Sequence, residues 1–80
     1  MYEQPQERLP KAVMIDEHGV AKMLGCPVAS VRKSHHEGRM PAPLRIGDQE
    51  RWRVRELRHW VEDGCPAREE WKWSPDRRSF

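Results

Sequence analysis

One segment, residues 14–62, constrains the fold of this chain more than any other feature. It holds two short helix signals separated by the three residues Gly25-Cys26-Pro27, then a basic stretch with the alternation of a β-hairpin, then a third helix signal. Two helices joined by a three-residue turn are typical of a helix-turn-helix. The order predicts a mainly α fold with a small β-hairpin: a winged helix-turn-helix of three helices plus a two-stranded wing.

The length limits the chain to one domain. It has 80 residues, of which 36% are hydrophobic and 35% are charged, so the core must be small. We expect a disordered N-terminal segment over 1–12, the winged helix-turn-helix over 13–64, and a C-terminal tail over 65–80. Trp71 and Trp73 predict that this tail packs on the domain or binds a partner, although a flexible tail is a third reading.

Neither secretion nor membrane insertion is indicated. No window approaches 18 apolar residues, and no apolar run with a cleavage site follows the first residues. We therefore expect a cytoplasmic protein without a membrane partner, whose thiols are reduced. Cys26 lies in an apolar stretch, which predicts a small core residue.

The first helix is predicted over about 17–24. Asp16 is a suitable N-cap and Gly25 a suitable stop. A glycine inside the helix, Gly19, costs about 1 kcal/mol relative to alanine. The apolar positions, spaced i, i+3 and i+4, are Val20, Met23 and Leu24.

The second helix is predicted from Pro27, as its first residue, to about Glu37, with Gly38 ending it. The expected inward side holds Val28, Val31, Ser34 and His35. A single outward stripe holds Ala29, Arg32, Lys33 and His36. Such a stripe is often only a solvated face. Its place directly after a helix and turn favours contact with the groove of a duplex.

The hairpin follows as alternating residues on both sides of a polar turn, residues 47–50. The expected buried face holds Leu44, Ile46, Trp52 and Val54, and the expected exposed face holds Arg45, Arg51 and Arg53. These arginines either contact DNA or form a charged face that protects a sheet edge. Residues 27–55 contain seven Lys or Arg against three acids, a net charge of +4, which favours a polyanionic partner.

A third helix is predicted over about 55–63. Leu57, Trp60 and Val61 are spaced to cover the core, and Gly64 ends the helix.

Several short motifs in this segment resemble excisionase-type and AlpA-type DNA-binding proteins, small relatives of the MerR winged-helix fold. They are Val20-Ala21-x-Met23-Leu24-Gly25, Ser30-Val31, Glu37-Gly38-Arg39-Met40-Pro41-x-Pro43, Arg45-Ile46-Gly47, Arg51-Trp52 and Glu56-Leu57-x-x-Trp60-Val61. Their order and spacing, rather than any single motif, carry the resemblance. The chain departs from that pattern at Gly19, where a glutamate is common, and at Ser34, where a bulky apolar residue is common.

The resemblance implies that the second helix enters the major groove while the wing touches phosphates or the minor groove. The groove-facing positions would be Val28, Ala29, Arg32, Lys33 and His36. The wing positions would be Arg45, Asp48, Gln49 and Arg51, and the alternation adds Arg53.

The expected function is sequence-specific binding of double-stranded DNA by a small phage or mobile-element protein. Excision control, as a recombination directionality factor, and prophage transcription regulation both fit. Neither a cofactor nor a small-molecule substrate is expected, and the protein is not expected to be an enzyme. Further copies of itself on adjacent sites, or an integrase, are the expected protein partners.

Two other readings remain. A protein-interaction adaptor on a winged-helix scaffold is the alternative, motivated by apolar Val28 and Ala29 and by the tryptophan tail. A zinc module is disfavoured because the chain has no Cys-x-x-Cys pair, and because adjacent histidines on a helix point about 100° apart.

Overall fold

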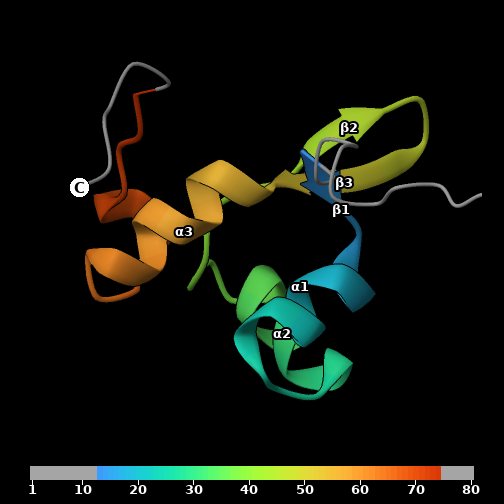
Figure 1. The fold of residues 1–80 in the computed structure, drawn as a ribbon, viewed down its shortest axis with the longest axis horizontal. Coiled ribbons are helices and arrows are strands. Elements are labelled where there is room, and N and C mark those ends of the chain that lie inside the picture. Colours follow the sequence, from blue (N-terminus) through green and yellow to red (C-terminus); the bar gives the residue numbers. More distant parts are fainter. Residues whose placement is uncertain (1–12, 75–80) are drawn as a thin grey trace, which may run out of the picture.

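Residues 13–74, the part of the chain that the computed structural model describes, contain three α-helices, three short strands and one 3-10 helix (Figure 1). In chain order the elements are β1 (Met14–Ile15), α1 (Glu17–Leu24), α2 (Val28–His36), β2 (Leu44–Ile46), β3 (Gln49–Arg53), α3 (Val54–Glu62) and the 3-10 helix η2 (Arg68–Glu70). The strands form one antiparallel sheet in the order β1-β3-β2. No described helix is long and apolar enough to cross a membrane. The expectation of disorder over 1–12 lies outside the described residues.

The first helix has the predicted bounds, and its caps explain them. The Asp16 carboxylate accepts a hydrogen bond of 2.9 Å from the Gly19 N–H, one of the N–H groups that a helix start leaves unpaired. That bond is the main reason why the pKa of Asp16 lies below its usual value. At the other end, Gly25 adopts the left-handed conformation with φ 71° and stops the helix.

Gly19 is required by a close approach between β1 and α1. A Cβ atom at this position would lie 2.7 Å from Cβ of Ile15 and 3.2 Å from its Cγ2. Ile15 in turn is held in the sheet, opposite Trp52 of β3. The glycine that weakens the helix is therefore what allows the strand to pack against it.

Gly19→Ala is therefore expected to destabilise the protein by about 1 kcal/mol, although alanine is the better helix former. The gain of about 1 kcal/mol in helix propensity is outweighed by an overpacking cost of about 1–3 kcal/mol. Urea unfolding measures the difference, and Ser30→Ala on the exposed face of α2 is the control, expected to change stability by less than about 0.5 kcal/mol. A more stable Gly19→Ala variant would show that Ile15 moves aside at little cost.

The second helix begins one residue later than predicted. Pro27 has φ −67° and ψ 152°, an extended conformation, so it is the N-cap residue and Val28 is the first helical residue. The C-terminal boundary is close to the prediction: the helix ends at His36, and Gly38 follows with φ 71°. Val31 is buried in the core and Val28 packs partly against it, as expected for the inward side.

The predicted faces of the hairpin are wrong. A two-residue turn, Gly47-Asp48, pairs Ile46 with Gln49, Arg45 with Glu50 and Leu44 with Arg51. Directly opposite residues lie on the same face of a sheet. Arg45 therefore shares a face with Trp52, whereas Leu44 and Ile46 share the other face with Arg51.

The cause of this error is the phase between the two strands. Residues alternate within each strand as predicted. However, the two-residue turn pairs Ile46 with Gln49, which lies three residues before Trp52. Because successive side chains of a strand point to opposite faces, Ile46 and Trp52 lie on opposite faces of the sheet. The exposures agree with the observed register: the Trp52 side chain is 3% exposed, and Ile46 is 54% exposed. The hairpin also gains a third strand that was not predicted, because β1 pairs with β3.

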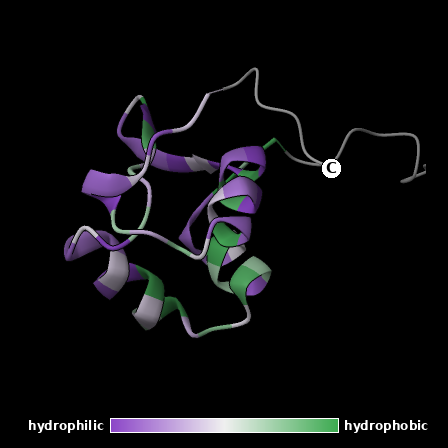
Figure 2. Ribbon diagram, turned by 90° about the vertical axis from the view of Figure 1, so that its left-hand side faces the viewer, coloured by the Kyte–Doolittle hydropathy of each residue, from purple (hydrophilic) through white to green (hydrophobic). Residues whose placement is uncertain are grey.

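The core lies between the helices and the inner face of the sheet. It consists of Val20, Ala21, Val31, Met40, Trp52, Leu57 and Trp60. Hydrophilic and hydrophobic residues alternate along the helices in Figure 2, as expected for helices with one buried face.

The third helix begins one residue earlier than predicted, at Val54, and ends at Glu62. Leu57 and Trp60 are buried as predicted, but Val61 is 44% exposed and does not cover the core.

The described part of the C-terminal tail packs on the domain. Trp71 donates its indole N–H to Glu56 Oε2 at 2.9 Å, and Trp73 donates to Nδ1 of the buried His59 at 2.7 Å. The Arg53 guanidinium stacks over the Trp73 ring, 5.3 Å from its centroid. Of the three readings of the two tryptophans, packing is the one observed.

Candidate nucleic-acid interface

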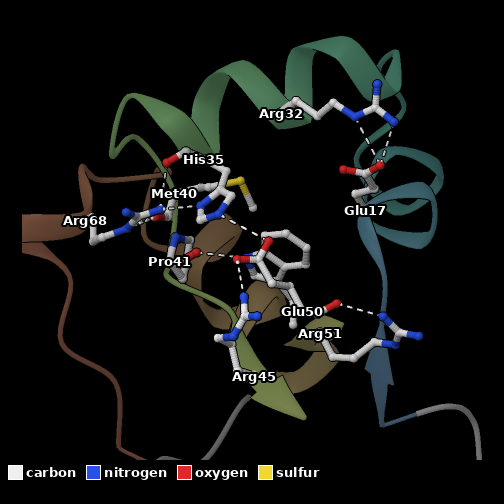
Figure 3. Close-up of polar contacts among 10 residues, drawn as sticks. Glu17, Arg32, His35, Met40, Pro41, Arg45, Glu50, Arg51 and Arg68 are labelled. Carbon is white, nitrogen blue, oxygen red and sulfur yellow. Dashed lines mark hydrogen bonds and ion pairs between the residues drawn. The ribbon is translucent and has the colours of Figure 1, made fainter. Parts of the chain in front are cut away.

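An open groove of about 560 Å³ separates the start of α1 from the hairpin. Its lining residues are Asp16, Glu17, His18, Arg45, Asp48, Gln49, Glu50, Arg51 and Trp52. Helix α2 borders it through two side chains, Arg32 and His35, which reach Glu17 and Glu50 respectively. Figure 3 shows these contacts between α2, α1 and the hairpin. Elements far apart in the sequence thus meet around one groove.

Arg32 is held by the first turn of α1. Oε2 of Glu17 accepts from both Nε of Arg32, at 3.0 Å, and Nη2, at 2.7 Å. The hydrogen bond from Arg32 is the main cause of a lowered pKa for Glu17, and the pKa of Arg32 is raised by the same bond. Both side chains are solvent-exposed enough that this pair contributes little to folding stability.

His35 lies at the junction of α2, the hairpin and the C-terminal segment. Its ring meets the Trp52 ring edge-on, with centroids 5.4 Å apart, and its Nε2 lies 3.5 Å from Oε1 of Glu50. Nη2 of Arg68 lies 2.9 Å from its Nδ1. Because a guanidinium can only donate, Nδ1 must accept, which places the ring proton of the neutral tautomer on Nε2, facing Glu50.

These contacts extend to the hairpin. Glu50 Oε2 lies 3.7 Å from Nη1 of Arg45, so a polar chain runs from Arg68 through His35 and Glu50 to Arg45 (Figure 3). Arg68 also donates to the backbone oxygens of Met40, at 2.8 Å, and of His35, at 3.0 Å. Sequence reasoning missed the roles of Arg68 and Glu50. No local pattern marks them, since Arg68 is 33 residues from His35.

Four of the five residues of α2 that were predicted to face a DNA groove lie on its outer side. Ala29, Arg32, Lys33 and His36 are exposed, whereas Val28 is half-buried against the core. The stripe therefore offers two fixed positive charges to solvent, one of which is already engaged by Glu17.

The predicted wing residues divide into two groups. Arg45, Asp48, Gln49 and Arg51 all line the groove. By register Arg51 belongs to the face opposite Arg45, yet its guanidinium bonds to the Glu50 carbonyl and the Gln49 side chain, both at 2.8 Å, which holds it at the groove. Arg53 does not line the groove; it contacts Trp73 and lies 3.4 Å from Glu56.

The charge of the groove differs from that of the segment that forms it. Its lining includes the acids Asp16, Glu17, Asp48 and Glu50 against the two arginines Arg45 and Arg51. A polyanion would therefore approach the exposed stripe of α2 and the hairpin more closely than the floor of the groove. Among residues 13–74, no group of three or more His, Cys, Asp or Glu is arranged to hold a metal ion, and both cysteines are free thiols.

Comparison with known proteins adds no assignment: no protein-family model matches the chain, and neither a curated protein nor a solved structure shows a significant match.

Proposed function

We propose that this protein binds double-stranded DNA as a winged helix-turn-helix, with α2 in the major groove and the β2–β3 hairpin as the wing. One observation carries the proposal. The hairpin face that bears Arg45 and Trp52 is joined to α2 through His35, so the cations of the helix and the wing are held in one arrangement.

The helix pair supports this reading. Helices α1 and α2 are separated by Gly25, Cys26 and Pro27, and the Cys26 N–H donates to Ala21 O at 3.0 Å, which closes the turn tightly. A second helix held in this way across a short turn is the part of a helix-turn-helix that enters the major groove. Its exposed side carries Arg32 and Lys33.

On this proposal each cation has a defined task. Arg32 and Lys33 reach base edges or the flanking phosphates, and Arg45 and Arg51 contact the backbone beside the wing. One module of this size buries only about 600–1,000 Å² on DNA, so specific action requires several copies or a second protein such as an integrase. An excisionase-like recombination factor and a prophage transcription regulator both use such binding.

The salt dependence of binding tests the assigned surface. We expect Arg32→Ala and Arg45→Ala to weaken binding to duplex DNA and to reduce the slope of log affinity against log salt by about 0.9 for each phosphate that the variant no longer neutralises. Fluorescence anisotropy with labelled duplexes at several salt concentrations measures both quantities. Arg58→Ala is the matched control, because Arg58 is exposed on α3 and lies beside Met23 and Val61 rather than at the groove. If all three variants behave like the wild type, the assigned surface is wrong.

The adaptor reading has less support than the sequence suggested. Trp71 and Trp73 are engaged by Glu56 and His59, so they are not free to anchor a partner as they stand. The described surface retains exposed apolar side chains at Val13, Ile46 and Val61, which lie just before β1, on the hairpin and on α3 respectively. DNA binding is therefore the function that we propose.

A further inference from the structure

We infer that Glu17 is a positioning residue that presents Arg32 to a single guanine, so that this acidic side chain sets sequence choice. The inference rests on the proposed DNA binding. It assigns a role to a carboxylate that lies at the interface although its charge opposes a polyanion. No feature of the sequence marked Glu17 as part of the site.

The geometry of the pair carries the inference. Oε2 of Glu17 accepts from Nε and from Nη2 of Arg32, which together form one edge of the guanidinium. Nη1 and the second hydrogen of Nη2 form the other edge, and Glu17 leaves that edge open (Figure 3). Two parallel N–H groups on one guanidinium edge match the O6 and N7 acceptors of guanine.

The anchor for Arg32 is itself fixed. Glu17 is the first residue of α1, directly after the Asp16 cap, and α1 packs against α2 through the core. A long arginine side chain loses much of its rotamer freedom when it binds a base, and restricting it beforehand lowers that cost. Glu17 is ionised and can hold the Arg32 guanidinium at neutral and mildly acidic pH, because the hydrogen bond from Arg32 keeps the pKa of Glu17 below its usual 4.5.

This role differs from that of an ordinary surface ion pair in a measurable way. Removing Glu17 deletes a negative charge near the DNA, so non-specific affinity should stay the same or increase. Discrimination for guanine should decrease, because Arg32 is no longer oriented. The two effects have opposite signs, whereas a merely structural role would weaken binding to every sequence alike.

Selection from a library of random-sequence duplexes with the wild-type protein first identifies the preferred site. Binding is then measured for that site and for duplexes in which each guanine is replaced in turn. We expect Glu17→Ala to lose about fivefold or more of the preference for guanine at one position. Glu17→Gln, which can still accept a hydrogen bond but carries no charge, should lose less. Arg32→Lys, which lacks the second donor edge, should lose the preference at the same position.

Glu37→Ala is the matched control, since Glu37 is also an exposed carboxylate paired with an arginine, Arg39, at 3.1 Å. It should leave the guanine preference unchanged. Thermal unfolding followed by circular dichroism shows that each variant is folded. If Glu17→Ala retains the wild-type preference at every guanine, the inference is wrong while DNA binding stands. If the wild-type protein selects no sequence and binds no duplex, the proposed function fails as well.

Discussion

Trp52→Ala is expected to leave most of the protein unfolded at room temperature, with a loss of about 3–5 kcal/mol in the free energy of unfolding. The Trp52 side chain is 3% exposed and belongs to the central strand of the sheet. Its indole N–H donates to the Pro41 carbonyl at 2.9 Å, and its ring meets His35 of α2. A domain this small has little stability to spare, so losing one such side chain is enough to unfold it.

A comparison of Trp52→Ala with Trp52→Phe separates the packing of the Trp52 ring from its hydrogen bond. Trp52→Phe keeps an aromatic ring but leaves the Pro41 carbonyl, on a buried residue, without its donor; a loss of about 1–3 kcal/mol is expected. Ile46→Ala in the same hairpin is the control, because its side chain is 54% exposed and should matter by less than about 0.5 kcal/mol. Circular dichroism without denaturant measures the folded fraction of Trp52→Ala, and urea unfolding gives the stabilities of Trp52→Phe and Ile46→Ala. If Trp52→Ala is fully folded and unfolds at the wild-type urea concentration, Trp52 is not the buried core residue described here.

Arg68→Ala is expected to cost about 2–3 kcal/mol, a large effect for a residue outside the three α-helices. Arg68 donates to the carbonyl of the buried Met40 and to two acceptors on His35, its carbonyl and its Nδ1. A hydrogen bond to a charged group contributes about 1.5–3 kcal/mol, and truncation leaves a buried carbonyl unpaired. The positive charge of Arg68 also lies at the C-terminal end of α2, where it is favourable.

The His35 ring provides a second measurement on the same variant. In Arg68→Ala, the described residues no longer place a donor at Nδ1 of His35. The preference of the neutral imidazole for the tautomer with its proton on Nε2 should therefore weaken. The NMR chemical shifts of the two imidazole nitrogens measure this change. Arg68→Lys should be intermediate, because one ammonium cannot reproduce the fork. Arg39→Ala is the control, since Arg39 is exposed and pairs with Glu37. Equal stability of Arg68→Ala and Arg39→Ala would contradict the proposed importance of the Arg68 contacts.

Much of the candidate site could be predicted because its residues lie on one short element. The stripe of Ala29, Arg32, Lys33 and His36 follows from helical periodicity, and all four are exposed. The groove could not be predicted in the same way, because Glu17 and Glu50 come from different elements and had no local signal. Alternation alone predicts that Arg53 lies on the exposed face of the hairpin, and its contacts with Trp73 and Glu56 are visible only in the structure.

The positions of the three helices, to within one residue at each end, follow from local sequence signals. The Asp16 cap, the Gly25 stop and the spacing of apolar residues act within a few residues of each other, so local chemistry is sufficient. Three features became visible only in the folded molecule: which face of the hairpin is buried, why residue 19 is a glycine, and which carboxylates contact Arg32 and His35. These features depend on contacts between segments that are distant in the chain, and neither helical nor strand periodicity carries information about the phase between two elements.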